Sequence, residues 1–122
     1  MADEITLYAR LGVANGNLRD SRDIGSVRVD QAAAGLVANV QTIGFAAHEA
    51  LVLGDVASVG FAHFQNLSSS AAVSVGIDDT GTFEPVVTML PGEPAGPFRL
   101  AGAPYAKADT AVAKLAYLIL ET

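Results

Sequence analysis

The sequence predicts an all-β protein, folded as a single β-sandwich of about eight short antiparallel strands. Apolar and polar residues alternate along several short segments, which is the period of a strand with one buried face. Gly, Pro, Asn and Asp interrupt these segments about every 8–12 residues, a spacing typical of sandwiches and barrels. At 122 residues the chain has the size of one domain with a two-layer core, so we expect residues 1–122 to form a single domain.

The N-terminal segment is predicted to be a strand followed by a charged connection. Residues 5–13 alternate between apolar and other side chains, and an Asn-Gly-Asn turn follows at residues 15–17, since an Asn-Gly pair favours positive φ. Residues 18–23 form a polar run, interpreted either as a solvated loop or as an arm that reaches a neighbouring subunit by charge pairing. The domain is therefore expected to begin with a possible contact arm over residues 1–23.

Three further strands are predicted in the next part of the chain. They cover residues 26–30, 36–46 and 49–53, and the small residues 31–35 form a loop between the first two. Three alanines in that loop are able to begin a helix, but Gly35 would end it at once.

The centre of the chain, residues 60–77, is predicted to be a β-hairpin: a strand, a serine-rich turn and a second strand. Short polar side chains in the turn bond their own backbone and favour chain reversal. In the first strand Phe61 and His63 point to one side while Ala62 and Phe64 point to the other. Because both sides carry bulky residues, we expect either a strand covered on both faces within the domain, or one covered by the core on one side and by a partner on the other.

A second turn is predicted at residues 78–81, and a strand over residues 82–90 is predicted to follow it. Pro85 lies inside that strand and lacks a backbone donor, so it indicates an edge position or a bulge. Residues 91–93, Pro-Gly-Glu, form a further turn.

The last part of the chain is predicted to hold three strands. The proline-rich residues 94–97 delay the first of them until residues 98–100, and the others cover residues 105–108 and 111–121. Ala, Lys and Leu make a helix the alternative for the final segment, but its β-branched and aromatic residues favour a strand.

The composition indicates an oligomer or a component of an assembly. Hydrophobic residues make up 51% of the chain and charged residues only 16%, against a typical charged share of about 25%. A small monomer has much surface to keep in water, so this shortage suggests that part of the surface is buried against other chains. The alternative is a soluble monomer whose many small residues raise the mean hydropathy.

The charge and the terminal segments exclude several classes of partner. A net charge of −6 argues against nucleic acid and against an anionic membrane surface as partners, because both attract clustered Lys and Arg. No apolar stretch reaches the roughly 20 residues that a bilayer requires. The acidic start, residues 1–4, does not resemble a signal peptide, so we expect a protein made in the cytoplasm.

The histidines and cysteines do not predict a metal site. His48 and His63 are the only histidines, they belong to different predicted strands, and neither has a carboxylate at a ligand-like spacing. His63 is expected to be a packed or interface residue and His48 a surface residue. With no cysteine in the chain, disulfides and thiolate sites are excluded.

Other short motifs are better explained as structure than as chemistry. Residues 78–81, Asp-Asp-Thr-Gly, lack the spaced acids of a calcium loop and read as a turn. Their last three residues match the string around an aspartic-protease nucleophile, but that chemistry needs a second such Asp. No serine lies in a nucleophile elbow and no glycine-rich phosphate loop is present. The sequence therefore predicts a protein that is not an enzyme and has no cofactor.

A series of short strings, taken in order, resembles the small structural proteins of tailed bacteriophages. The resemblance covers nearly the whole chain, and it is carried by the order of the strings rather than by any one of them. They are NGNLRDS at 15–21, VDQAAAG at 29–35, LGDV at 53–56, QNL at 65–67, VGI at 75–77, PGE at 91–93, YAKADTA at 105–111 and LAYLI at 115–119.

The resemblance implies a virion component, a jelly-roll-like sandwich that decorates or cements a capsid shell. It also implies the major capsid protein and other copies of this chain as partners, and the capsid surface as location. The chain departs from the family pattern after Asn66-Leu67, where a serine and alanine run replaces a longer polar loop. A contact made by that loop is therefore not carried over.

Candidate interface residues lie in the N-terminal arm, in the first strand of the predicted hairpin and at the Pro85 edge. They are Tyr8, Arg10, Leu18, Arg19, Arg22, Phe61, His63, Phe64 and Pro85. The alternative function is a tail or fibre module that binds a host-surface glycan. The sequence offers such a module little for stacking, since it has no Trp and its three Tyr fall on different predicted strands.

Overall fold

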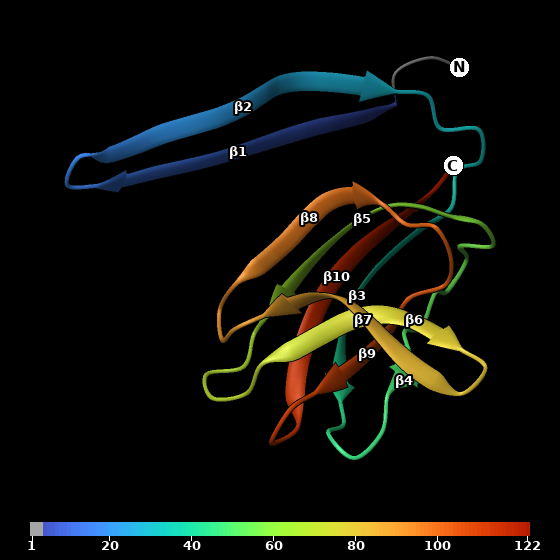
Figure 1. The fold of residues 1–122 in the computed structure, drawn as a ribbon. Helices are drawn as coiled ribbons and strands as arrows, with labels where there is room; N and C mark the ends of the chain where they lie inside the picture. The colour runs from blue at the N-terminus through green and yellow to red at the C-terminus, as the bar shows by residue number, and fades with distance from the viewer. Residues whose placement is uncertain (1–3) are drawn as a thin grey trace.

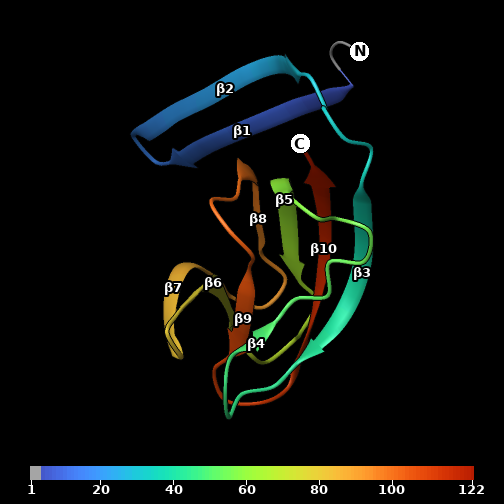
Figure 2. The ribbon, with the colours of Figure 1, turned by 90° about the vertical axis from the view of Figure 1, so that its right-hand side faces the viewer.

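A computed structural model describes residues 4–122, without the side chain of Ile24. That part of the chain has ten strands and no helix, arranged in three antiparallel sheets (Figure 1). Eight strands form two four-stranded sheets that pack face to face, and the first two strands pair with each other above them (Figure 2). Along residues 4–122 there is no helix of the length and apolar character needed to span a membrane.

The eight-stranded part is a jelly roll. The first sheet has the order β3-β10-β5-β8, with bounds Leu36–Ile43, Ala113–Glu121, Val59–Asn66 and Pro94–Arg99. The second has the order β4-β9-β6-β7, with bounds Glu49–Ala50, Tyr105–Ala108, Val73–Asp79 and Thr82–Met89. These two orders are those of an eight-stranded jelly roll. The predicted all-β sandwich is thus confirmed, with two strands added outside it.

The core lies between the two sheets and follows the period of two. Every second residue of β10 faces inward and is buried, and the side chains between them face outward. The largest wholly buried apolar side chains come from β3, β5, β6, β7 and β10: Ile43, Phe64, Val73, Met89, Leu115 and Ile119. The final segment is a strand and not a helix because this alternation lets it bury one face.

The predicted hairpin over residues 60–77 is wrong in its pairing. Strands β5 and β6 form as expected, but they lie in different sheets: β5 pairs with β10 and β8, and β6 pairs with β7 and β9. The buried Asn66 fixes the crossing between the sheets, because its amide donates to the carbonyl oxygens of Ala71 (2.8 Å) and Met89 (3.0 Å). Its Oδ1 accepts from the Ser68 amide (2.9 Å).

The first two strands, β1 (Ile5–Asn15) and β2 (Leu18–Val29), form a long two-stranded ribbon. Residues 18–23, predicted to be a loop or arm, are strand, because each of them pairs with a residue of β1. The tight turn between Asn15 and Leu18 sets this register, with Gly16 at φ 56° as the Asn-Gly signal predicts. The segment expected to be a contact arm is therefore part of a hairpin that ends at residue 29, and its residues 1–3 lie outside the described part.

Three smaller predictions are resolved by the pairing. Pro85 lies on the edge strand β7 and next to a bulge, since Val75 pairs with Val87 and Gly76 with Pro85, so both features it indicated are present. Residues 94–97 belong to β8, so the prediction that they delay the strand is wrong. The predicted strand 49–53 shortens to the two residues of β4.

Candidate interaction surface

The ribbon is amphipathic. Residues paired directly across an antiparallel ladder share a face, so its register divides the side chains into two sets. One set, here named the apolar ribbon face, contains Ile5, Leu7, Ala9, Leu11, Val13, Leu18, Val27 and Val29. The opposite set is mainly polar: Thr6, Tyr8, Arg10, Arg19, Ser21, Asp23, Ser26 and Arg28. Only Asp20 and Arg22 place charge on the apolar ribbon face.

The base of the apolar ribbon face packs against the sandwich. Ile5 is only 3% exposed, and Leu7, Ala9 and Val29 are half-buried. A cavity of about 240 Å³ lies at the contact between this base and β5, β8 and β10; its lining includes Ile5, Leu7, Phe61, Pro97, Leu118 and Leu120. The ribbon therefore packs on the sandwich at its base, through the residue pairs that begin with Ile5 and Val29.

The tip of the apolar ribbon face has no cover within the described chain. Leu11 is 77% exposed, Leu18 61% and Val13 45%. The ribbon runs past the β8 edge of the sandwich, so its tip stands away from the rest of the domain (Figures 1 and 2). A lone two-stranded hairpin is marginally stable in water, which makes uncovered apolar residues on it a feature that calls for a partner.

The outward side of the first sheet is a second apolar surface, here named the outer sheet face. Its strand residues are Leu36, Ala38, Val40, Thr42, Phe61, His63, Gln65, Pro94, Pro97, Arg99, Lys114, Ala116, Leu118 and Leu120. None of these residues is an Asp or Glu. Their positive groups are Lys114 and Arg99, and the Arg99 guanidinium lies 4.5 Å from the Phe61 ring centre.

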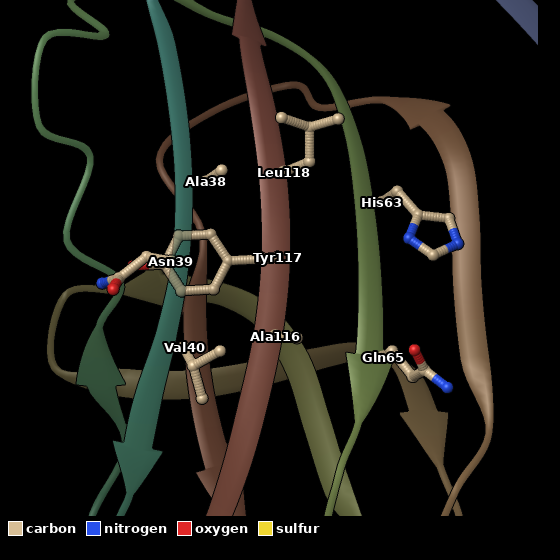
Figure 3. A pocket seen from close by; sticks show the side chains of 8 residues that line it. All are labelled: Ala38, Asn39, Val40, His63, Gln65, Ala116, Tyr117 and Leu118. Carbon is tan, nitrogen blue, oxygen red and sulfur yellow. The ribbon is translucent and has the colours of Figure 1, made fainter.

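The ribbon covers only part of the outer sheet face. Away from the ribbon base the face forms an open hollow of about 510 Å³ around Ala38, Val40, His63, Gln65, Ala116 and Leu118. Figure 3 shows the side chains of Val40, His63 and Leu118 rising on the same side of their strands. Val40 is 51% exposed and Leu118 39% exposed.

A polar cluster braces the edge of the sheet beneath this hollow. The Tyr117 hydroxyl lies 2.7 Å from the Val52 carbonyl oxygen and accepts from the Asn39 amide at 3.1 Å. Gln41 Oε1 lies 3.1 Å from the same hydroxyl and accepts from the Val52 amide. The bonds tie β3 and β10 to the segment after β4, so the strands that carry the outer sheet face are held in one position.

The second sheet carries an aromatic cluster on its outward side. His48 Nε2 lies 2.8 Å from Asp78 Oδ1, and the His48 ring stacks on Phe83 with ring centres 5.4 Å apart. Tyr105 lies 5.6 Å from the same ring. The sequence did not reveal this cluster because its members are separated by up to 57 positions along the chain and meet only through the pairing of β6, β7 and β9. His48, expected at the surface, is partly covered.

The predicted interface residues fall into separate regions. Tyr8, Arg10 and Arg19 lie on the polar side of the ribbon and Leu18 and Arg22 on its apolar side, while Phe61 and His63 belong to the outer sheet face and Pro85 to the exposed β7 edge. Tyr8, Phe61 and His63 line the same cavity at the ribbon base. Phe64 does not belong to any surface, because it alternates with His63 and is wholly buried in the core.

Residues 4–122 contain no group of three or more His, Asp or Glu side chains placed to hold a metal ion. Comparisons with protein-family models, with curated proteins and with solved structures find no match to this chain. The candidate site is therefore defined by its geometry alone: an amphipathic ribbon and an apolar sheet face, each half covered.

Proposed function

We propose that this protein is a non-enzymatic structural component of a virion, a decoration or cement protein of a phage head that binds the major capsid protein and copies of itself. The observation that carries the proposal is the uncovered tip of the apolar ribbon face. An ordered ribbon that exposes Leu11, Val13 and Leu18 to water gains stability when another chain covers it. A protein whose task is to add contact area between neighbours needs such a surface and no catalytic group.

Two further features support an assembly role. Charged residues are few for a domain of this size, and the outer sheet face has no acidic residue among its strand positions. Jelly rolls recur in viral capsid and lectin domains, a support by analogy of fold. The exposed β7 edge near Pro85 offers a second contact region for the capsid protein.

The experiment is to add the purified full-length protein to heads that lack it, and to image the particles by electron microscopy. We expect regular density on the head surface and heads that release their DNA at a higher temperature than bare heads. Leu18→Glu, at the ribbon tip, should lower the occupancy about tenfold or more. Val112→Glu, an equally exposed apolar residue at 60% that lies far from the ribbon, should not. Density confined to the tail, or none, would overturn the proposal.

One observation favours the glycan-binding alternative. The cluster of His48, Phe83 and Tyr105 beside Asp78 combines aromatic rings with a carboxylate, as sugar sites do. These rings pack on one another and are only half-exposed, which leaves little ring face for a sugar. Glycan-array binding that Tyr105→Ala abolishes would favour this alternative over the capsid role.

A further inference from the structure

The covered half of each surface shows what the ribbon fits. At the ribbon base, Ile5 and Leu7 face the Leu118 and Leu120 end of the outer sheet face, with Phe61 beside them. Ile5 is nearly inaccessible there. The apolar ribbon face and the outer sheet face are thus already partners within one chain.

The uncovered halves repeat the same chemistry. The ribbon continues from Ile5 and Leu7 to Leu11 and Val13 on the same face. The sheet continues from the Leu118 row, paired with Ala38 and His63, to the row of Val40, Ala116 and Gln65. Both continuations are aliphatic in the main and exposed, so each is a suitable cover for the other.

The two uncovered halves of one chain lie apart from each other. The strands of the ribbon stay paired from Ile5 to Asn15 over 11 residues, a span of about 35 Å at the rise of a strand. The ribbon leaves the sheet at the β8 side, whereas the uncovered rows lie lower on β3, β10 and β5 (Figures 2 and 3). The tip is therefore presented to another molecule.

Charge favours a second copy as that molecule. Two chains of net charge −6 repel each other over most of their surfaces. The outer sheet face lacks acidic residues along its strands and carries Lys114 near the open rows. Asp20, one of two charged residues on the apolar ribbon face, is a suitable partner for such a cation.

From these contacts we infer that the tip of the apolar ribbon face of one copy packs on the open rows of the outer sheet face of a second copy. The inference rests on the proposed function, since it names the self-contact of the assembly protein. The contact is head-to-tail, because the ribbon of one copy meets a different surface, the outer sheet face, on the other copy. A contact of this kind closes as a ring or a reciprocal pair where the rotation between copies allows it, and otherwise continues as an open filament.

The test is sedimentation velocity of the purified full-length protein over a concentration series, without capsid protein. Wild type should self-associate. Leu11→Glu on the ribbon and Val40→Glu on the sheet should each weaken self-association and raise its dissociation constant about tenfold or more, because each buries a carboxylate in the contact. Both residues are exposed in the single chain, so both variants should keep the wild-type circular dichroism spectrum and melting temperature.

Two controls carry the same new charge elsewhere. Ser21→Glu lies at the height of Leu11 on the opposite side of the ribbon, and Val86→Glu lies on β7 in the second sheet, at a residue that is 75% exposed. Each should associate like wild type. A mixture of Leu11→Glu and Val40→Glu should form mixed pairs, because the intact ribbon of one variant meets the intact sheet of the other.

A monomeric wild type, equal weakening by Ser21→Glu, or a mixture that fails to pair would each overturn the inference. If the protein is a monomer but still binds heads, the self-contact is contradicted and the proposed function is not. If the protein self-associates but never binds heads, the proposed function is contradicted and the self-contact is not.

Discussion

Strands β1 and β10 share an alternating sequence pattern but differ in what covers them. In β10 every second residue from Ala113 to Glu121 is buried, because the second sheet lies against that side. In β1 the same alternation buries only Ile5 and leaves Leu11 77% exposed. The period of two therefore determines which residues share a face. Whether that face is buried from solvent depends on a second layer that packs against it.

The largest expected effect compares one leucine in each strand. Leu115→Ala in β10 should lower the free energy of unfolding by about 2–5 kcal/mol, since it leaves a cavity in the core. Leu11→Ala in β1 should change it by no more than about 0.5 kcal/mol, since the side chain is in water. Urea unfolding at a concentration where the protein is monomeric measures both. Equal losses would mean that the ribbon tip is packed in the free subunit.

A smaller effect is expected from two asparagines. Asn66→Ala removes the buried side-chain amide that donates hydrogen bonds to the carbonyl oxygens of Ala71 and Met89. It should therefore lower the free energy of unfolding by about 1–3 kcal/mol. Asn15→Ala, on the exposed ribbon, should lie within about 0.5 kcal/mol of wild type. Thermal and urea unfolding give the difference. An unchanged Asn66→Ala would show that the crossing between sheets is fixed by other contacts.

The third expectation concerns acid. The backbone amides of Ser58 (2.9 Å) and Ala57 (2.7 Å) donate to Glu121 Oε2 and hold the pKa of this carboxyl below its usual value. Its contribution to stability is present above the pKa of the unfolded chain and is lost as the pH falls through the lower pKa of the folded protein. Glu121→Gln should therefore be less stable than wild type at neutral pH and lose less stability on acidification.

Melting temperatures between pH 7 and pH 3 measure this difference. The matched variant is Glu84→Gln, on the exposed edge strand β7, which removes one carboxylate without touching these amides. If Glu121→Gln and wild type lose stability in parallel, the two hydrogen bonds do not stabilise the charged carboxyl.

The smallest effect is expected at the two histidines, both outside the core. His48→Ala removes the contact to Asp78 and the stacking on Phe83 and should cost no more than about 1 kcal/mol, as exposed pairs do. His63→Ala, on the outer sheet face, should be close to neutral in the monomer. Unfolding curves of the two variants compare them directly. A larger loss at His63 would place this ring in a contact within one chain.

Much of the fold could be predicted because local chemistry decides it. The Asn-Gly turn, the Pro85 edge and bulge, and the strand over Ala113–Glu121 each follow from a preference of the residue itself. The pairing of β5 could not be predicted. Its neighbour along the chain, β6, is as suitable a partner as β10 or β8, and the buried amide of Asn66 that sends the chain to the other sheet looks like any polar turn residue.

The site was half predicted for the same reason. Leu18 and His63 were expected at an interface and do lie on the two exposed apolar surfaces, while Phe64, one residue away from His63, lies in the core. The alternation of side chains along β5 does not determine which of its two bulky faces is buried in the core. The cluster around His48 could not be predicted because its partners Asp78, Phe83 and Tyr105 come from three different strands, β6, β7 and β9.

By itself the sequence determined the strands, most of their turns, the all-β class and the shortage of charge, because these depend on neighbours within a few residues. The tertiary structure alone decided which strands pair, which face of β5 is buried, and that the amphipathic ribbon is covered at Ile5 and bare at Leu11. The physical reason is that burial belongs to layers: a side chain is removed from water only when a segment distant in sequence packs against it.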